Sequence, residues 1–256
     1  MAPIKMAWFR GRNNCGDILG PLLARYITGQ EPEYVVANEN HVFDHYFTVG
    51  SMITRSKSNT IIWGSGVLKP GPLLIKPKKI CAVRGPTSRQ YLISHKVACP
   101  EVYGDPALLM PRFFKPKVAV QYELGIIPHY VDKLNGRLRE VGKDTLVIDV
   151  QRHPEKVITD ILKCKNIASS SLHGVILADA YGIPSLWLTL SDKVLGAQFK
   201  FDDYFQSIGS AYVEYVVGKK LDTADILEKC RRRPIKLDLD LLLESCPFRR
   251  RNDRQV

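Results

Sequence analysis

The chain has 256 residues, of which 45% are hydrophobic and 25% charged, and its formal net charge is +11. This composition is typical of a globular protein with one large or two small domains, and no stretch reaches the roughly 18–20 apolar residues of a membrane-spanning helix. The six cysteines form no C-x-x-C pair, which argues against a disulfide framework or a zinc site. Residues 1–12 lack a signal-peptide pattern, so we expect a cytoplasmic protein.

The first part of the chain alternates predicted strands with predicted helices. A strand over residues 3–9 is followed by a Gly- and Asn-rich loop and by a helix over 18–27, which Gly29 ends. The same pattern continues with strands and helices in the segments 42–53, 60–63, 80–83, 87–93 and the turn that Pro106 follows. We predict a first α/β domain over residues 1–113.

Two prolines in residues 111–116 interrupt this pattern and indicate an interdomain linker. Strands and helices then alternate again over the segments 122–127, 145–150, 154–162, 167–188 and 222–230. We predict a second α/β domain over residues 117–230. Alternation on both sides of a linker predicts two domains with mostly parallel sheets that face a cleft.

A serine- and histidine-rich turn stands out in the second domain. Ser169, Ser170 and Ser171 follow a buried strand, and Leu172, His173 and Gly174 open an apolar helix. A strand-to-helix turn gathers backbone N–H groups at a helix N-terminus, which favours an anion. We interpret His173 as a functional residue, with a structural histidine as the alternative.

Other polar groups are predicted at the same edges of the two sheets. They are Asn14, Asp17, the turn of Gly64, Ser65 and Gly66, Arg84, Asp105 and His129. Arg84 is suited to a carboxylate or phosphate, or forms a surface salt bridge; Asp17 and Asp105 are either helix caps or functional carboxylates. The residues alone predict a transferase or hydrolase that acts on a phosphorylated or carboxylated compound.

The segment 231–256 is predicted to be a basic C-terminal tail. Basic residues outnumber acidic ones in it, and leucines between positions 237 and 243 make it partly amphipathic. Such a tail suits the anionic inner leaflet of a membrane, or is a solvated terminal helix. We expect no nucleic-acid partner, because no nucleic-acid-binding motif accompanies the charge.

Several motifs together resemble the polysaccharide pyruvyltransferase family. They are N-C-G-D-I-L at 14–19, W-G-S-G at 63–66, A-V-R-G-P-T-S-R at 82–89, Y-G-D-P-A-L-L at 103–109, I-P-H-Y at 127–130 and S-S-S-L-H-G-V-I-L-A-D-A-Y-G-I-P at 169–184. The chain is most similar to the bacterial exopolysaccharide ketal pyruvyltransferases of the xanthan and succinoglycan type, and F-K-F-D-D-Y at 199–204 strengthens this likeness. The basic tail has no counterpart in the pattern.

The resemblance implies two Rossmann-like domains in a glycosyltransferase-B-like arrangement. The implied donor is phosphoenolpyruvate, with no cofactor and no metal. The implied acceptor is a sugar of a lipid-linked exopolysaccharide repeat unit, which would receive a pyruvate ketal. We expect peripheral contact with the inner face of the plasma membrane through the tail.

The resemblance also implies roles for the candidate residues. His173 would be the general acid or would bind the donor phosphate, Arg84 would hold the donor, and Asp17 or Asp105 would be the base. Substrate-binding roles fall to Asn14, the turn at 64–66, His129, the turn at 169–174 and Lys200. We expect His173→Ala and Arg84→Ala each to abolish transfer with little change in melting temperature. The alternatives are a nucleotide-sugar glycosyltransferase of the same architecture and a non-catalytic saccharide-binding protein.

Overall fold

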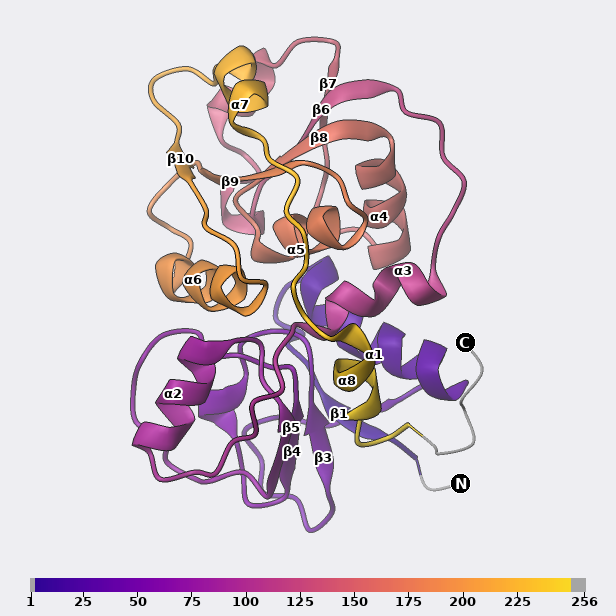
Figure 1. Cartoon of the computed structure of the whole chain (residues 1–256), viewed down its shortest axis with the longest axis vertical. Coiled ribbons are helices and arrows are strands. Elements are labelled where there is room, and N and C mark those ends of the chain that lie inside the picture. The colour runs from indigo at the N-terminus through magenta and orange to yellow at the C-terminus, as the bar shows by residue number, and fades with distance from the viewer. Residues whose placement is uncertain (1–2, 250–256) are drawn as a thin grey trace.

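Two parallel sheets, one above the other, organise the computed structural model, which describes residues 3–249 (Figure 1). Within these residues the first sheet has five strands in the order β2-β1-β3-β4-β5, and all its pairings are parallel. Its strands are β1 (Lys5–Ala7), β2 (Glu33–Tyr34), β3 (His45–Phe47), β4 (Thr60–Trp63) and β5 (Lys79–Ala82). The order reverses at β1, so the carboxyl ends of β1 and β3 meet at the kind of switch point where open α/β sheets bind ligands.

The second sheet has the same design. Its described strands follow the order β10-β9-β8-β6-β7, again with parallel pairings only. They are β6 (Tyr122–Ile127), β7 (Thr145–Val147), β8 (Cys164–Ser169), β9 (Ser185–Thr189) and β10 (Glu214–Val216). The predicted α/β class with two Rossmann-like units and parallel sheets is thus confirmed.

Helices cover both sheets and fill the space between them (Figure 1). They are α1 (Cys15–Thr28), α2 (Pro86–Ser94), α3 (Met110–Phe113), α4 (Pro154–Leu162), α5 (Leu172–Ala180), α6 (Ala197–Ser207), α7 (Thr223–Lys229) and α8 (Leu239–Glu244). The helix α1 begins three residues earlier than predicted. The Asn14 side chain accepts a hydrogen bond from the Gly16 N–H and so caps the first turn there.

The two halves share one apolar core. A single cluster of buried side chains contains Leu19 and Trp63 from the first half and Ile127, Val175 and Trp187 from the second. The chain passes from one sheet to the other through the predicted linker, whose first residues are helical because they belong to α3. The continuous core holds the edges of both sheets at fixed positions around the space between them.

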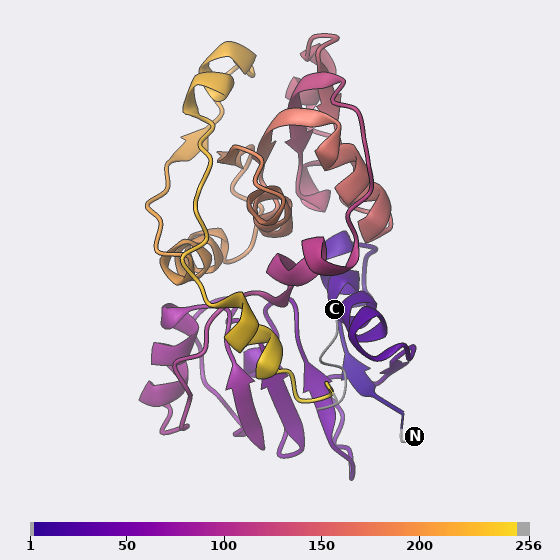
Figure 2. The same cartoon turned by 45° about the vertical axis from the view of Figure 1, so that its right-hand side comes forward.

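The C-terminal segment crosses back from the second half to the first (Figure 2). Arg231 exchanges backbone hydrogen bonds with Ser185 beside β9, and farther along the indole N–H of Trp63 donates to the Leu242 carbonyl at 2.9 Å. Leu242 is fully buried, and the Arg233 guanidinium pairs with the buried Asp179. This corrects the predicted amphipathic tail: its apolar face and Arg233 hold the fold together and are not available to a lipid surface.

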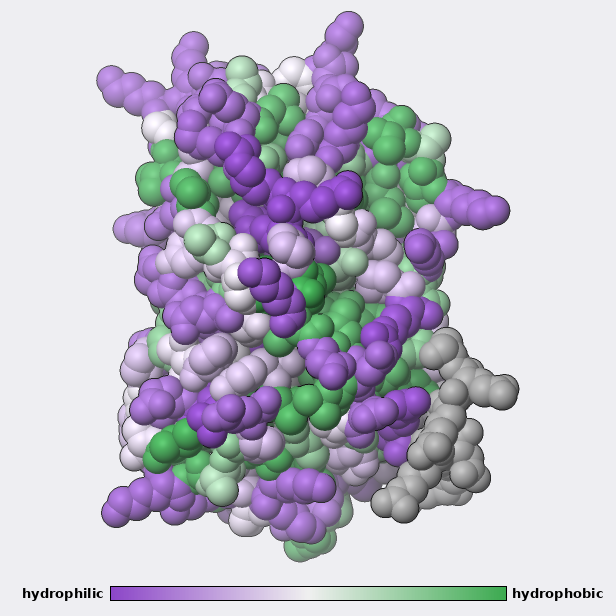
Figure 3. Space-filling view, viewed as in Figure 1, coloured by the Kyte–Doolittle hydropathy of each residue, from purple (hydrophilic) through white to green (hydrophobic). Residues whose placement is uncertain are grey.

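The face that carries α8 shows this packing from outside. Apolar side chains gather near its middle, over the region of α3 and α8, and charged side chains project from the rest (Figure 3). No helix within residues 3–249 is long and apolar enough to cross a membrane. The last seven residues of the predicted tail, 250–256, lie outside the described residues.

Candidate functional site

A cavity of about 280 Å³ lies between the two halves and is lined by residues of both. The first half contributes the N-terminus of α1 and the turn after β3, and the second half contributes the loop after β6, the N-terminus of α5 and the start of α6. The polar lining side chains are Asn14, Asp17, Ser51, Arg55, His129, Tyr130, Ser171, His173, Lys193 and Lys200. The predicted cleft thus brings Asn14, Asp17, His129, His173 and Lys200 together.

His173 and Asp105 form a pair across the interface between the halves. His173 is in the first turn of α5, and its Nε2 lies 3.5 Å from Oδ2 of the fully buried Asp105. Neither atom has a hydrogen-bond partner within residues 3–249. The carboxylate therefore orients the imidazole through Nε2 and leaves Nδ1 for another group.

Gly16 makes room for this imidazole. A Cβ on Gly16 would lie 2.0 Å from Nδ1 of His173, so a larger residue could not occupy the first turn of α1 without displacing the ring. Asp105 is fixed in turn, because its Oδ1 accepts the Ala107 N–H and caps the short helix that follows. The predicted cap of Asp105 is thus present through one oxygen, and the other oxygen faces His173, where its role as a functional carboxylate stays a prediction.

Three ionisable groups of the cavity have displaced pKa values, and for two of them the value lies near neutral pH. Burial raises the pKa of Asp17 to about 6, although the charges of His173, Lys200 and Arg55 oppose the rise. Burial and the nearby Arg84 charge lower the pKa of Lys200 to about 8. Both groups therefore titrate close to neutral pH, which is where groups that move protons or bind anions reversibly are useful.

His129 has a different character. Burial and the neighbouring charges of Lys200 and His173 lower its pKa to about 4, so it is neutral at pH 7. Its Nδ1 accepts a hydrogen bond from the Val131 N–H at 3.4 Å. This imidazole is suited to hydrogen bonding with a substrate, and not to balancing an anion.

The three serines divide into structural and cavity-facing residues. Ser169 Oγ donates to the Ile127 carbonyl, and Ser170 Oγ accepts from the His129 N–H. Ser171 caps the N-terminal side of α5 and lines the cavity. Ser169 and Ser170 are thus spacers that hold the turn, and this corrects their predicted direct contact with substrate in this cavity.

The neighbours of His173 on α5 divide in the same way. Leu172 lines the cavity, as predicted. Gly174 does not, and a Cβ on it would lie 2.2 Å from Ser169 Oγ. Its role is close packing of α5 on β8, which corrects the predicted substrate contact.

Arg84 lies behind the cavity wall. It is fully buried, and its guanidinium donates at 2.9 Å to Asp203 Oδ2, Ser51 Oγ and the Val67 carbonyl. Asp203 also accepts from the N–H and hydroxyl of Ser88, so both side chains of the pair are held by several protein hydrogen bonds. These contacts replace the predicted donor contact of Arg84, and they also exclude the surface salt bridge.

The turn at 64–66 is also a support and not a phosphate loop. Ser65 Oγ accepts from the Met52 N–H and donates to the Gly50 carbonyl. A Cβ on Gly66 would lie 2.2 Å from Cζ of Arg84, and Gly64 has a φ of 78°. The predicted substrate contacts of these residues are corrected: the turn shapes the 50–52 segment, which does line the cavity.

Four polar lining residues were not proposed as site residues from the sequence: Ser51, Arg55, Tyr130 and Lys193. Ser51 and Lys193 lie in irregular segments, and Arg55 and Tyr130 lie in 3-10 helices of three residues, so no helical or strand period marks them. The G-S pair at 50–51 after an expected strand was the one available signal. Arg55 and Lys193 join Lys200 as cations facing the cavity, opposite one carboxylate, Asp17. Two helix N-termini, of α1 and α5, open onto the same space, which is therefore suited to an anion.

The comparisons with known proteins agree with this geometry. The model of the polysaccharide pyruvyl transferase family matches residues 14–192. The uncharacterized protein L143 of Acanthamoeba polyphaga mimivirus is 31% identical over 210 residues, 79% of this chain and 73% of that protein. The succinoglycan biosynthesis protein ExoV of Rhizobium meliloti is 28% identical over 178 residues, 64% of this chain and 54% of ExoV.

A solved structure supports the fold. A functionally uncharacterized protein of Klebsiella pneumoniae superposes with a TM-score of 0.51 at 12% identity, over 82% of this chain and 92% of that one. The family match covers more than half of the chain and includes Asp17, Asp105 and His173. The chain belongs to the polysaccharide pyruvyl transferase family, and it is a transferase that acts on a polysaccharide or oligosaccharide.

Proposed function

We propose that the chain transfers the pyruvyl unit of phosphoenolpyruvate to a sugar of a lipid-linked exopolysaccharide repeat unit, as a pyruvate ketal. One observation carries the proposal: the cavity combines an oriented imidazole, a carboxylate of raised pKa and three cations at two helix N-termini. Phosphoenolpyruvate is a small compound with a phosphate and a carboxylate, and its reaction needs both proton donation and proton removal. Family membership supports the pyruvyl unit as the group that is transferred.

The cations bind the donor in this scheme. Lys200, Arg55 and Lys193 hold the phosphate and carboxylate, and the Leu172 N–H at the N-terminus of α5 completes the site. Loss of water from the cavity on binding strengthens each of these contacts. The scheme uses no cofactor and no metal, because these cations balance the negative charge of the leaving phosphate.

His173 acts as the general acid. Its Nδ1 donates a proton to the methylene carbon of the enol, which becomes a methyl group, while Asp105 stabilises the imidazolium through Nε2. The central carbon then has oxocarbenium character, and a sugar hydroxyl attacks it. The C–O bond to phosphate breaks and a second hydroxyl of the same sugar closes the ketal. Of the two hydroxyl protons, one replaces the proton that His173 gave and the other leaves with the phosphate.

Asp17 is the base on the acceptor hydroxyl. It lies in the first turn of α1 and lines the same cavity as His173, so an acceptor in this cavity can meet both groups. A pKa of about 6 leaves Asp17 ionised at pH 7 and still able to take up a proton. Asp105, the other predicted base, is buried behind His173 and is assigned to orientation.

A second cationic cavity supports a lipid-linked acceptor. It has about 360 Å³, meets the first cavity at Phe9, and contains Arg10, Arg12 and Arg25. A diphosphate linkage between glycan and lipid would fit such a site by charge. We propose that the reaction takes place at the cytoplasmic face of the membrane, where such a lipid carrier would present its glycan.

Phosphate release from phosphoenolpyruvate tests the proposal, measured with and without lipid-linked oligosaccharides from an exopolysaccharide producer. We expect release that depends on the oligosaccharide, with pyruvate mass on the glycan. His173→Asn is the negative control. Absence of release together with binding of UDP- or GDP-sugars would replace the proposal by a nucleotide-sugar glycosyltransferase, and glycan binding without turnover by a saccharide-binding protein.

A further inference from the structure

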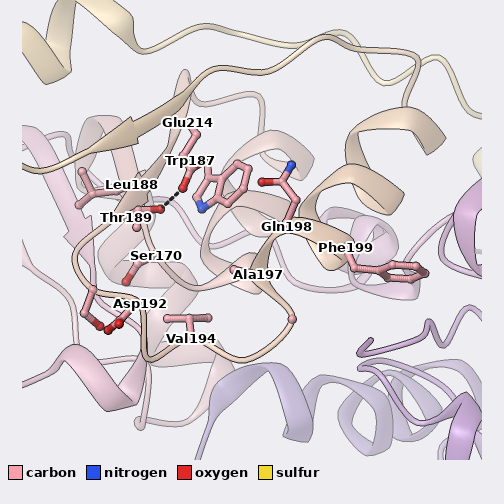
Figure 4. Close-up of a pocket in the computed structure, with 12 residues that line it drawn as sticks. Ser170, Trp187, Leu188, Thr189, Asp192, Val194, Ala197, Gln198, Phe199 and Glu214 are labelled. Carbon is pink, nitrogen blue, oxygen red and sulfur yellow. Dashed lines mark hydrogen bonds between the residues drawn. The ribbon is translucent and has the colours of Figure 1, made fainter. Parts of the chain in front are cut away.

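A third cavity lies on the other side of the 190–196 loop. It has about 540 Å³, within the range of small-molecule sites, and lies among β9, β10 and the start of α6 (Figure 4). Its polar lining residues are Ser170, Thr189, Ser191, Asp192, Gln198 and Glu214, together with the indole of Trp187. No function described above uses it.

Its charge is opposite to that of the donor cavity. None of its lining residues within 3–249 is Lys, Arg or His, and Asp192 and Glu214 are both carboxylates. Phosphates and carboxylates of a ligand would therefore be repelled. Carboxylates that face a cavity accept hydrogen bonds from hydroxyl groups and also attract cations, so the charge of the lining excludes anions and admits an uncharged polyhydroxyl compound.

Trp187 provides the second observation. It is 98% buried, stacks on Phe201 with ring centroids 4.2 Å apart, and no residue within 3–249 accepts a hydrogen bond from its indole N–H. Figure 4 shows this nitrogen facing the space bounded by Thr189, Ser170 and Ala197. The nitrogen is not among the buried polar atoms of residues 3–249 that lack a partner, so it is open to the cavity and available as a donor to a ligand there.

Glu214 places an acceptor near this donor. Its Oε1 accepts from the Thr189 hydroxyl at 2.7 Å, which fixes the carboxylate at the edge of the cavity (Figure 4). An acceptor and a donor that lie side by side on the neighbouring strands β10 and β9 recognise neighbouring hydroxyls of a sugar ring, whereas the apolar walls at Leu188 and Val194 suit its C–H faces.

The two cavities share their dividing wall. Along the loop, Asp192, Val194 and Gly196 line the third cavity, whereas Lys193 and Leu195 line the donor cavity. Ser170 and Ser171 line one each, and consecutive Cα atoms are only about 3.8 Å apart. A glycan whose reacting sugar lies in the donor cavity can therefore place another sugar across the loop.

We propose that this third cavity is a subsite for an uncharged sugar of the acceptor glycan, next to the sugar that receives the ketal. The proposal rests on the proposed function for the identity of the acceptor. It separates recognition into a cationic site for the donor and a neutral site for the glycan.

Binding of uncharged sugars tests it, with glucose, galactose, mannose and their disaccharides titrated at millimolar concentrations and followed by NMR. Trp187→Phe removes the indole N–H and keeps a smaller aromatic ring for the stack on Phe201, and Glu214→Gln changes one surface carboxylate. We expect at least one sugar to bind wild type, and each variant to bind it about five- to tenfold more weakly, as for one lost hydrogen bond. Glu140→Gln, an exposed carboxylate elsewhere in the same half, is the matched control with unchanged affinity.

The subsite would be overturned if no sugar binds wild type, or if neither variant weakens binding. A competition experiment with UMP gives the third such outcome, in which UMP displaces the sugar from wild type and not from Trp187→Phe. Phosphoenolpyruvate binding is titrated in parallel on wild type. If wild type binds a sugar and does not bind phosphoenolpyruvate, the proposed donor is contradicted and the subsite is not. The opposite pattern would contradict the subsite alone.

Discussion

Two buried pairs join the two halves of the molecule, and they differ in how completely they are hydrogen-bonded. Arg84 and Asp203 are held by several protein hydrogen bonds: the guanidinium has three protein acceptors and the carboxylate three donor contacts, counting Arg84 once and Ser88 twice. His173 and Asp105 face each other at 3.5 Å with atoms that have no hydrogen-bond partner in the described structure.

This difference separates a structural pair from a reactive one. A buried ion pair with several protein hydrogen bonds is fixed in place, so its contribution is to hold β5, α2 and α6 in register. An unsaturated pair retains a proton that it can give and a charge that it can stabilise, at some cost in stability. The comparison predicts that substitutions in the first pair change folding and that substitutions in the second change catalysis.

The largest expected effect is that of His173→Asn. Removal of the general acid should lower the rate of transfer by about 10²–10⁴-fold. The melting temperature should change little, because the imidazole makes few hydrogen bonds with the protein. Steady-state phosphate release and thermal unfolding measure the two quantities. An active His173→Asn would show that the unsaturated pair is not the reactive one.

Arg84→Ala should act on stability. Asp203 would remain charged and buried without its partner, and we expect the free energy of unfolding to fall by about 3–5 kcal/mol. This replaces the expectation from the sequence that the variant folds normally. Urea denaturation measures the loss, and the apolar double variant Arg84→Met/Asp203→Leu should recover much of it. A variant that is inactive and as stable as wild type would restore the predicted donor contact.

Asp105→Asn tests orientation of the imidazole. The amide keeps the cap on Ala107 but cannot stabilise the imidazolium, so we expect kcat to fall about 100-fold while KM for phosphoenolpyruvate stays near its wild-type value. If the variant is less stable than wild type and its kcat is unchanged, Asp105 is only a helix cap.

The pH dependence of transfer should show two limbs. Asp17 must be ionised to act as a base, so kcat/KM rises as the pH increases through about 6, and Lys200 must be protonated to bind the donor, so it falls above about 8. Lys200→Arg, which stays charged, should shift the upper limb to higher pH. A profile that is flat between pH 5 and 9 would contradict both assignments.

The elements with a clear period were predictable from the sequence. The strands at 60–63 and 122–127 and the helix at 154–162 have the predicted bounds, because each has prolines, glycines or charges at its ends. The edge strands β2 and β10 have two and three residues and carry no period. The helix α8 was read with the basic tail because the contact of Leu242 with Trp63 joins residues far apart in the sequence.

The sequence was enough to predict several polar side chains of the cavity, but not which residues these side chains contact. His173, Asp17 and Asn14 lie next to glycines at strand-to-helix turns, and such turns mark a sheet edge. A sequence does not show whether an arginine at such an edge faces outward or inward, and Arg84 faces Asp203, which is 119 positions away. Arg55 and Lys193 became site residues only through the way their loops fold.

The most direct test of the account follows the proton that His173 is proposed to give. Transfer is run in D₂O with phosphoenolpyruvate and lipid-linked oligosaccharide, and the pyruvyl group on the glycan is analysed by mass spectrometry and NMR. The account predicts a ketal whose methyl group carries one deuterium from the solvent, and no product with His173→Asn. A transferred group that keeps its methylene, without deuterium, would contradict protonation at this carbon and with it the proposed role of His173.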